Sequence, residues 1–276
     1  MKGRVLIIAG SDSSGGAGLQ ADIKTVTALG GYAMTAVTAI TAQNTLGVTA
    51  IHPIPVDIIQ AQIDACLSDI GADVIKIGMI GSAEIAHALM VSLRAPLSAQ
   101  IPIVLDPVLV ATSGDVLGDD DVVDVILDQL LPRAAIVTPN IQELARLAGR
   151  PVATLDAMRT AGHHLMKKMT DSSVVLKGSH LADTDDIINI LLGTDREVLI
   201  KTPRLDTRHT HGTGCTLASA LATGMAQGLS LEDAFRRAVS FVHRAIQNAP
   251  GFGAGNGPLN HSFAINTYLV DPDGDE

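Results

Sequence analysis

Residues 5–22 read Val-Leu-Ile-Ile-Ala-Gly-Ser-Asp-Ser-Ser-Gly-Gly-Ala-Gly-Leu-Gln-Ala-Asp, and this stretch indicates the type of fold. Its first five residues are apolar, which predicts a buried strand over residues 5–9. A glycine-rich turn follows, and a helical pattern covers residues 19–29. The stretch therefore predicts a strand, a turn and a helix, which together begin a β-α-β crossover unit.

The same alternation continues along most of the chain. Further buried strands are predicted at residues 36–40, 74–77, 103–105, 135–137 and 174–176. Helices are predicted at residues 56–70, 83–93, 121–131, 141–147 and 155–169. This pattern is typical of an α/β fold in which helices flank both faces of a central, mostly parallel β-sheet. In open sheets of this kind, ligands bind beyond the carboxyl ends of the strands.

The last part of the chain completes this architecture. A short antiparallel pair is predicted at residues 186–192 and 197–201, with its turn at residues 193–196. Two more helices are predicted at residues 215–227 and 231–248. No Pro/Ser-rich or charged linker divides the sequence, so we expect one domain over residues 1–270 and an acidic tail at residues 271–276.

Charge and cysteine content argue against several classes of protein. The formal net charge is -10, and the basic residues are scattered rather than clustered, which argues against a nucleic-acid partner. Cys66 and Cys215 are too few for a disulfide framework, so we expect a reduced, cytoplasmic protein. No apolar run reaches the roughly 18 residues that a membrane span needs. An anionic substrate would have to be held by local groups.

Residues 209–215 read His-Thr-His-Gly-Thr-Gly-Cys and stand directly before an apolar helical stretch. The glycines allow a tight turn, and the first amides of the helix lie at the positive end of its dipole, where a phosphate binds readily. The same field would favour the thiolate of Cys215, which makes it a candidate proton acceptor or nucleophile. The alternative is a glycine-rich turn followed by a small buried cysteine.

The turn at residues 10–18 is not a standard nucleotide loop. It lacks the Lys-Ser/Thr ending of a P-loop and the spacing of a dinucleotide-binding fingerprint. It remains a strand-to-helix turn at the ligand edge of the sheet. Asp22 stands one turn inside the helix, where it could contact an amino or hydroxyl group of a small substrate. Its alternative role is to complement the helix dipole.

Carboxylates follow two further strands. Asp106 comes directly after residues 103–105, at a strand end where a carboxylate can hold Mg²⁺ or its waters. Asn140 and Glu143 stand three residues apart after the next strand, so their side chains can meet at one place. The same spacing is also a common helix-capping arrangement, in which the two side chains serve only the helix.

Lys177 ends the strand at residues 174–176, so we expect its ammonium over the same edge as Asp106 and Glu143. His209 and His211 lack a third nearby ligand, so we expect them to form hydrogen bonds in a loop rather than to bind zinc. The amide cradle, the cation and the carboxylates together predict a phosphoryl-transfer site. Such a site acts mainly by positioning and electrostatic stabilisation.

With these residues assembled, the sequence resembles the ribokinase-like small-molecule kinases. Within them it is similar to the bacterial hydroxymethylpyrimidine/phosphomethylpyrimidine kinases of thiamin biosynthesis. The similarity covers nearly the whole chain. It is carried by residues 9–22, Thr-Ala-Gln-Asn at 41–44, Lys-Ile-Gly-Met at 76–79, Asp-Pro-Val at 106–108, Thr-Pro-Asn-Ile-Gln-Glu at 138–143, the cradle ending in Cys215, and Gly-Asn-Gly-Pro-Leu-Asn-His at 255–261.

The resemblance implies an activity and assigns site residues. It implies phosphorylation of 4-amino-5-hydroxymethyl-2-methylpyrimidine by MgATP, and then of the monophosphate to the diphosphate. The residues that it implies for the pyrimidine pocket are Gly10, Asp22, Gln43, Met79 and Val108. Those implied for the anion hole are Gly212, Thr213 and Gly214, with Lys177 at the ATP phosphates. The residues implied to organise Mg²⁺, directly or through water, are Asp106, Asn140 and Glu143.

The residue type at position 215 narrows the group of kinases that the sequence resembles. Most ribokinase-like kinases end the cradle with Asp, whereas Cys is found in the pyrimidine kinases and in some similar pyridoxal kinases. A pyridoxal kinase is therefore an alternative, and a non-catalytic pyrimidine-binding protein with the same fold is another. The resemblance also implies a homodimer with one active site within each subunit.

Overall fold

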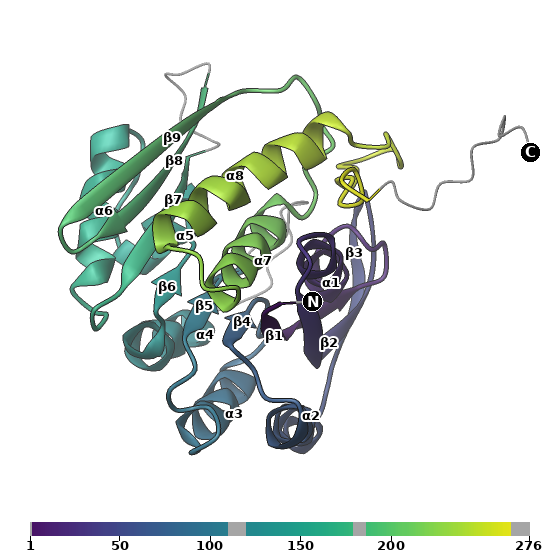
Figure 1. Ribbon diagram of the computed structural model, residues 1–276, viewed down its shortest axis with the longest axis vertical. Helices are drawn as coiled ribbons and strands as arrows, with labels where there is room; N and C mark the ends of the chain where they lie inside the picture. The colour runs from purple at the N-terminus through teal and green to yellow at the C-terminus, as the bar shows by residue number, and fades with distance from the viewer. Residues whose placement is uncertain (1, 110–119, 179–185, 266–276) are drawn as a thin grey trace, which may run out of the picture.

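A computed structural model describes residues 2–109, 120–178 and 186–265 of the chain. One nine-stranded sheet runs through these ranges in the order β3-β2-β1-β4-β5-β6-β7-β8-β9 (Figure 1). Its strands are β1 (Arg4–Asp12), β2 (Tyr32–Asn44), β3 (Gly47–Pro53), β4 (Val74–Ile77), β5 (Ile103–Leu105), β6 (Ile136–Val137), β7 (Ser173–Gly178), β8 (Asp186–Gly193) and β9 (Arg196–Pro203). The predicted acidic tail lies outside the described residues.

The central strands are parallel, and the two margins are antiparallel. Strands β2, β1, β4, β5, β6 and β7 pair in parallel, whereas β3 and the β8–β9 pair join antiparallel. The chain passes from β1 to β2 on one side and then returns to place β4 on the other side of β1. This reversal creates a crevice at the carboxyl ends of β1 and β4, where ligands of such sheets bind.

Helices cover both faces of the sheet, as the alternating pattern predicts (Figure 1). One layer contains α1 (Gly18–Ala28), α7 (Thr213–Ala226) and α8 (Leu231–Gln247). The other contains α2 (Val56–Asp69), α3 (Ala83–Arg94), α4 (Asp120–Val125), α5 (Ile141–Ala148) and α6 (Leu155–Met166). The predicted α/β fold class is therefore confirmed.

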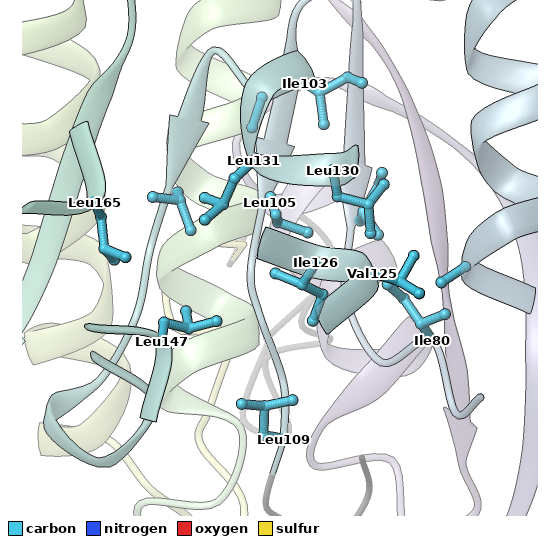
Figure 2. Close-up of a cluster of buried hydrophobic side chains, with 14 of the residues drawn as sticks. Ile80, Ile103, Leu105, Leu109, Val125, Ile126, Leu130, Leu131, Leu147 and Leu165 are labelled. Carbon is cyan, nitrogen blue, oxygen red and sulfur yellow. The ribbon is translucent and has the colours of Figure 1, made fainter. Parts of the chain in front are cut away.

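Each face of the sheet has its own aliphatic core. Along β1, Leu6 and Ile8 join the core under α2 to α6, whereas Val5 and Ile7 join the core under α1, α7 and α8. Successive strand residues point to opposite faces, so a continuous apolar strand supplies both cores. Figure 2 shows part of the first core, where side chains of β5 meet those of the segment after α4.

Two elements differ in kind from the predicted ones, and β2 extends beyond both ends of the strand predicted at residues 36–40. The helix expected over residues 121–131 is α4 followed by a π-helical turn (Ile126–Leu130) and a 3₁₀ turn (Leu131–Arg133). A proline at position 132 cannot donate a backbone hydrogen bond, which favours the tighter ending. The strand β3 was not predicted at all. It is an exposed edge strand that ends in Pro53, so it carries no buried apolar run.

Candidate active site

A large cavity opens at the carboxyl ends of the parallel strands. Its volume is about 890 Å³, within the range of small-molecule sites. The ends of β1, β4, β5 and β7 and the starts of α5 and α7 contribute to its wall. The predicted site residues on this wall are Gly10, Gln43, Met79, Asp106, Val108, Asn140, Glu143, Lys177, Gly212, Thr213, Gly214 and Cys215.

The predicted cradle forms the start of α7. Gly212 precedes the helix with a φ of 86°, a left-handed conformation that favours glycine. The amide of Thr213 donates to the carbonyl oxygen of Thr210 at 3.3 Å. The amides of Gly214 and Cys215 lie in the first turn, where an α-helix supplies no acceptor and its dipole favours an anion. The start of α7 can therefore hold an anionic group at the cavity wall.

Three charged side chains meet beside the cradle. The Nζ of Lys177 lies 2.9 Å from Oδ1 of Asp106 and 3.9 Å from Oε2 of Glu143. A methyl group on Gly214 would come within 3.1 Å of the same Nζ, so the ammonium adjoins the cradle. Burial lowers the pKa of Lys177, but the carboxylates of Asp106 and Glu143 outweigh burial and raise it. Lys177 is therefore a cation placed against the anion site.

Asn140 and Glu143 serve as a capping box and also face the cavity. The Oδ1 of Asn140 accepts from the amide of Glu143 at 2.9 Å, and Oε2 of Glu143 accepts from the amide of Asn140 at 2.8 Å. The structural alternative is therefore confirmed, yet both residues line the cavity. Burial raises the pKa of Glu143 to about 7 against the opposing charge of Lys177. Capping fixes where this carboxyl group stands.

A compact group of side chains lines the cavity at the ends of β1, β2 and β4. A methyl group on Gly10 would lie 3.1 Å from the sulfur of Met79, so glycine leaves room at this point. The hydroxyl of Thr38 donates to the carbonyl oxygen of Met79 at 2.7 Å. The Oε1 of Gln43 accepts from the hydroxyl of Thr41 at 3.2 Å. This part of the wall combines apolar contact with one amide side chain, as recognition of a small polar ring requires.

Residues of β8, β9 and α8 add a further section of wall that the sequence analysis did not predict. Its apolar members are Ile187, Leu205, Val239, Val242 and Ile246. Its polar members are Asn189, Thr202, Arg204 and His243. These residues carry no local motif and are brought together only by the packing of α8 against the β8–β9 pair.

A sequence model of the family described as phosphomethylpyrimidine kinase matches residues 12–260. The chain belongs to the phosphomethylpyrimidine kinase family. It is 40% identical to the hydroxymethylpyrimidine/phosphomethylpyrimidine kinase of Bacillus subtilis, over 94% of this chain and 94% of that protein. The Rhizobium meliloti kinase of the same name is 42% identical over 93% and 96%. The Geobacter sulfurreducens thiamine biosynthesis bifunctional protein ThiED is 44% identical over 95% of this chain, which spans 53% of its length.

Solved structures of kinases share the fold. The ADP complex of Bacillus subtilis pyridoxal kinase matches with a TM-score of 0.86 and 30% identity, over 95% of this chain and 98% of that one. The phosphomethylpyrimidine kinase of Clostridium difficile matches with a TM-score of 0.79 and 36% identity, over 89% and 100%. The predicted ribokinase-like kinase fold is confirmed by these matches.

One predicted site residue of this kinase does not reach the cavity. Asp22 is fully buried, and its carboxylate lies 2.8 Å from Nζ of Lys76 and accepts from the hydroxyl of Ser219 at 2.6 Å. The expectation that Asp22 contacts a substrate directly is therefore wrong. Both of its oxygens are engaged by groups of β4 and α7, and α1 packs against α7.

Lys76, unlike Asp22, reaches the cavity wall. It is fully buried in the middle of β4, yet it lines the cavity. Burial lowers the pKa of Lys76, but the nearby negative groups, first among them Asp22, outweigh it and raise the pKa. A lysine inside the run Val-Ile-Lys-Ile was a usable signal, because a continuous apolar strand is covered on both faces.

The charge state of Cys215 also differs from the expected one. Burial raises the pKa of the Cys215 thiol to about 12, although Lys76 and the amide of Gly18 act in the opposite direction. Burial and the charges of Asp22 and Asp106 together outweigh these two groups. The prediction of a favoured thiolate is therefore wrong, and Cys215 stands at the cradle as a neutral thiol.

Two further expectations can be compared with the described residues. None of the helices in these ranges is long and apolar enough to cross a membrane. The same ranges contain no cluster of three or more His, Cys, Asp or Glu side chains that could by themselves hold a metal ion. Nε2 of His211 lies 2.8 Å from Oδ2 of Asp12, as expected for a hydrogen-bonding histidine, whereas Nδ1 of His209 is buried without a hydrogen-bond partner among the described residues.

Proposed function

We propose that this chain transfers a phosphoryl group from ATP to 4-amino-5-hydroxymethyl-2-methylpyrimidine, and then to the resulting monophosphate to form the diphosphate. The observation that carries this proposal is the position of Lys177 Nζ beside the cradle at Gly214, inside one cavity that Gln43 and Met79 also line. The names of relatives about 40% identical over nearly all of this chain support the substrate.

The cavity has separate places for the two reactants. The pyrimidine ring lies against Gly10, Gln43, Met79 and Val108, with the amide of Gln43 at its polar edge. The nucleotide base lies against the apolar side chains of α8, and Lys177 holds the phosphates. The hydroxyl oxygen of the pyrimidine bonds to the γ-phosphorus as the bond to the ADP oxygen breaks, and the hydroxyl proton is released.

The cradle and Lys177 serve the transition state of this transfer. Charge accumulates on the equatorial oxygens of the phosphoryl group while it moves between donor and acceptor. Backbone amides of α7 and the ammonium of Lys177 are already in place for these oxygens and need no reorganisation. Because Cys215 is a neutral thiol, it orients the acceptor hydroxyl rather than removing its proton in advance.

The residues present fit Mg²⁺ when phosphates are also bound. Asp106 and Glu143 supply hard carboxylate oxygens, which Mg²⁺ prefers, but they are only two ligands and Lys177 stands between them. Magnesium commonly completes its coordination with waters and substrate phosphates. Asp106 and Glu143 would hold the ion through such waters, and Asn140 would keep Glu143 in place. The ion would neutralise charge on the nucleotide.

The test is to follow products from purified protein, MgATP and hydroxymethylpyrimidine by mass-resolved chromatography. Monophosphate that is later converted to diphosphate is the expected result, and Cys215→Ala serves as the control for the site. A second reaction contains pyridoxal in place of the pyrimidine. Turnover of another alcohol with none on hydroxymethylpyrimidine would overturn the proposal.

A pyridoxal kinase is the second candidate. It is favoured by the structural match to pyridoxal kinases, including that of Staphylococcus aureus with AMP-PCP and pyridoxal, which has a TM-score of 0.85 and 33% identity. Both substrates present a hydroxymethyl group on an aromatic nitrogen ring. Phosphorylated pyridoxal alone would assign the chain to this second function. Tight pyrimidine binding in calorimetry without ADP release would instead indicate a non-catalytic binding protein.

We also propose that the chain forms a homodimer through the region of β2 and β3. Ile40 and Leu46 are exposed there by 49% and 69%, which leaves apolar surface at this margin of the sheet. Light scattering should give twice the chain mass of 28.6 kDa. A mass equal to one chain would contradict this proposal. The cytoplasmic location expected from the two cysteines stays a prediction, to be checked by cell fractionation.

A further inference from the structure

A buried hydrogen bond joins two loops that are far apart in the sequence. Asp12 ends β1, and His211 directly precedes the cap of α7. The Nε2 of His211 lies 2.8 Å from Oδ2 of Asp12, and the two residues are only 4% and 3% exposed. Both also line the cavity. Neither residue has a role in the phosphoryl transfer described above.

Asp12 organises the whole turn that follows β1. Its Oδ1 accepts from the amide and from the hydroxyl of Ser14, each at 2.8 Å. Its Oδ2 accepts from the amide of Ala17 at 2.8 Å as well as facing His211. Burial raises the pKa of Asp12, but the hydrogen bonds from His211, Ser14 and Ala17 outweigh it and lower the pKa. The carboxylate is ionised and only accepts, so His211 carries a proton on Nε2.

The residues held by this hydrogen bond are those that start two helices. Ala17 is the cap of α1, and the next amide, that of Gly18, is near enough to Cys215 to lower the pKa of its thiol. His211 is followed by Gly212, the cap of α7. The carboxylate of Asp12 thus fixes one helix start through Ala17 and the other through His211.

The two loops touch through positions that lack a side chain. A methyl group on Gly16 would overlap the imidazole ring of His211, and one on Gly212 would overlap the carbonyl oxygen of Gly16. The approach is therefore set by backbone contact and leaves no room for a larger residue. A contact this close needs a directional bond to hold it, because glycine-rich turns have many other conformations available to them.

We propose that Asp12 and His211 are positioning residues whose hydrogen bond holds the start of α1 against the start of α7. The pair keeps the two helix starts in contact and so fixes where the first amides of α7 stand on the cavity wall. Its effect on turnover rests on the proposed kinase function. Its effect on the two loops does not, so the two can be tested separately.

The first test measures local opening by hydrogen exchange with mass spectrometry. In His211→Ala, the peptides that cover residues 12–20 and 209–216 should exchange about tenfold faster, because the restraint on both helix starts is lost. In His211→Gln, whose amide can still donate to Asp12, exchange should return toward the wild-type rate. The control is His163→Ala, which removes an exposed histidine on α6 and should change neither peptide. Unchanged exchange in His211→Ala would overturn the proposal.

The second test measures turnover of the accepted alcohol. The kcat of His211→Ala should fall roughly 100-fold, as for other small displacements of reacting groups, with a much smaller change in KM for the alcohol. His211→Gln should recover a large part of this loss. Equal losses of kcat in the two variants would overturn the positioning role. If the wild type phosphorylates neither hydroxymethylpyrimidine nor pyridoxal, the proposed function fails. Hydrogen exchange alone then tests whether the Asp12–His211 hydrogen bond holds the two helix starts together.

A variant that keeps both side chains covers the case in which His211→Ala does not fold. Gly16→Ala places a methyl group against the His211 ring and should push the two loops apart. It should accelerate exchange in both peptides as His211→Ala does, and it should lower kcat in the same direction. Wild-type exchange and kcat in Gly16→Ala would contradict the proposal, because the close approach would then be dispensable.

Discussion

At the scale of single residues, the site depends on groups whose charge is set by burial and neighbours. Lys177 stays charged because two carboxylates outweigh its burial, whereas Cys215 is neutral because burial outweighs the positive groups around it. At the cradle, Lys177 therefore supplies a positive charge and Cys215 a neutral thiol. In the proposed function, the ammonium of Lys177 would stabilise the transferred phosphoryl group, and the thiol of Cys215 would orient the acceptor.

Cys215→Ala should lower kcat far more than it weakens pyrimidine binding, with a fall in kcat of roughly 100-fold. The reason is that the thiol faces the acceptor hydroxyl mainly while the phosphoryl group moves. Steady-state kinetics gives kcat, and calorimetry gives the Kd of the pyrimidine. Cys66→Ala on α2 is the matched control and should keep the wild-type rate. An unchanged kcat in Cys215→Ala would remove Cys215 from the mechanism.

Lys177→Ala should lower kcat/KM for ATP by roughly 100-fold, the usual cost of losing one group that stabilises transition-state charge. Pyrimidine binding should be retained, because the pyrimidine wall lies at Gln43 and Met79. Kinetics at varied ATP and calorimetry with the pyrimidine measure the two effects. Lys167→Ala, at an exposed position after α6, is the control. Loss of pyrimidine binding in Lys177→Ala would show that the lysine is assigned to the wrong ligand.

At the scale of elements, the site is held where α7 meets its neighbours. The ion pair of Asp22 and Lys76, together with Ser219, ties α1, β4 and α7 to one another. Near the start of α7, Thr216 donates to the carbonyl oxygen of Gly212 at 2.7 Å and lies 2.8 Å from Nε2 of His261. These contacts hold the start of α7 in position, so they contribute to the stability of the protein as well as to the geometry of the cradle.

Lys76→Met should lower the free energy of unfolding by about 3–5 kcal/mol, because it leaves the carboxylate of Asp22 buried without an opposite charge. The double variant Lys76→Met with Asp22→Asn should lose much less, since no isolated charge remains and the amide can still meet Ser219. Urea unfolding of the three proteins measures the difference. A double variant that is less stable than Lys76→Met would contradict this account of the ion pair.

His261 should make stability depend on pH. Burial, with a smaller contribution from Lys24, lowers its pKa from 6.5 to about 4. At pH values between these two, the unfolded chain binds a proton that the folded protein does not. The free energy of unfolding therefore has its full value above the unfolded pKa of 6.5 and falls as the pH drops toward 4. The loss at pH 5 should be about 2 kcal/mol. In His261→Gln, the difference in unfolding free energy between pH 7.5 and pH 5 should shrink by this amount, and an unchanged difference would contradict it.

At the scale of the whole molecule, two aliphatic cores on either side of one sheet hold the cavity in place. The chain has only four Phe, two Tyr and no Trp, so branched aliphatic side chains fill most of both cores. Phe235 is an exception, because it is completely buried under α7 and α8. The same α8 supplies the apolar wall at Val239, Val242 and Ile246, so core packing and the cavity share one helix.

Phe235→Ala should lower the free energy of unfolding by about 3–5 kcal/mol, because it leaves a cavity where the surrounding helices cannot fully close. Phe252→Ala is the matched control, since Phe252 is 67% exposed. The control should change the free energy by less than about 0.5 kcal/mol. Chemical denaturation of both variants measures the effects. Equal stability of the two variants would contradict the assignment of Phe235 to the core.

Local patterns in the sequence were sufficient for the fold class and for the charged edge of the cavity. Continuous apolar runs such as residues 74–77 predict strands covered on both faces, and polar residues directly after strands must gather at one edge of a parallel sheet. Asp106, Glu143 and Lys177 meet there for this reason. The glycine at position 212 likewise marked the start of α7 through its backbone requirement.

Tertiary packing alone decided the remaining features, because they depend on burial and on partners distant in the sequence. Asp22 turns away from the cavity since Lys76 and Ser219 engage both of its oxygens. Cys215 is a neutral thiol because the surrounding chain removes water from its sulfur, a cost that no local motif reveals. The bond between Asp12 and His211 spans 199 positions of the sequence, and only the folded chain brings the two loops together.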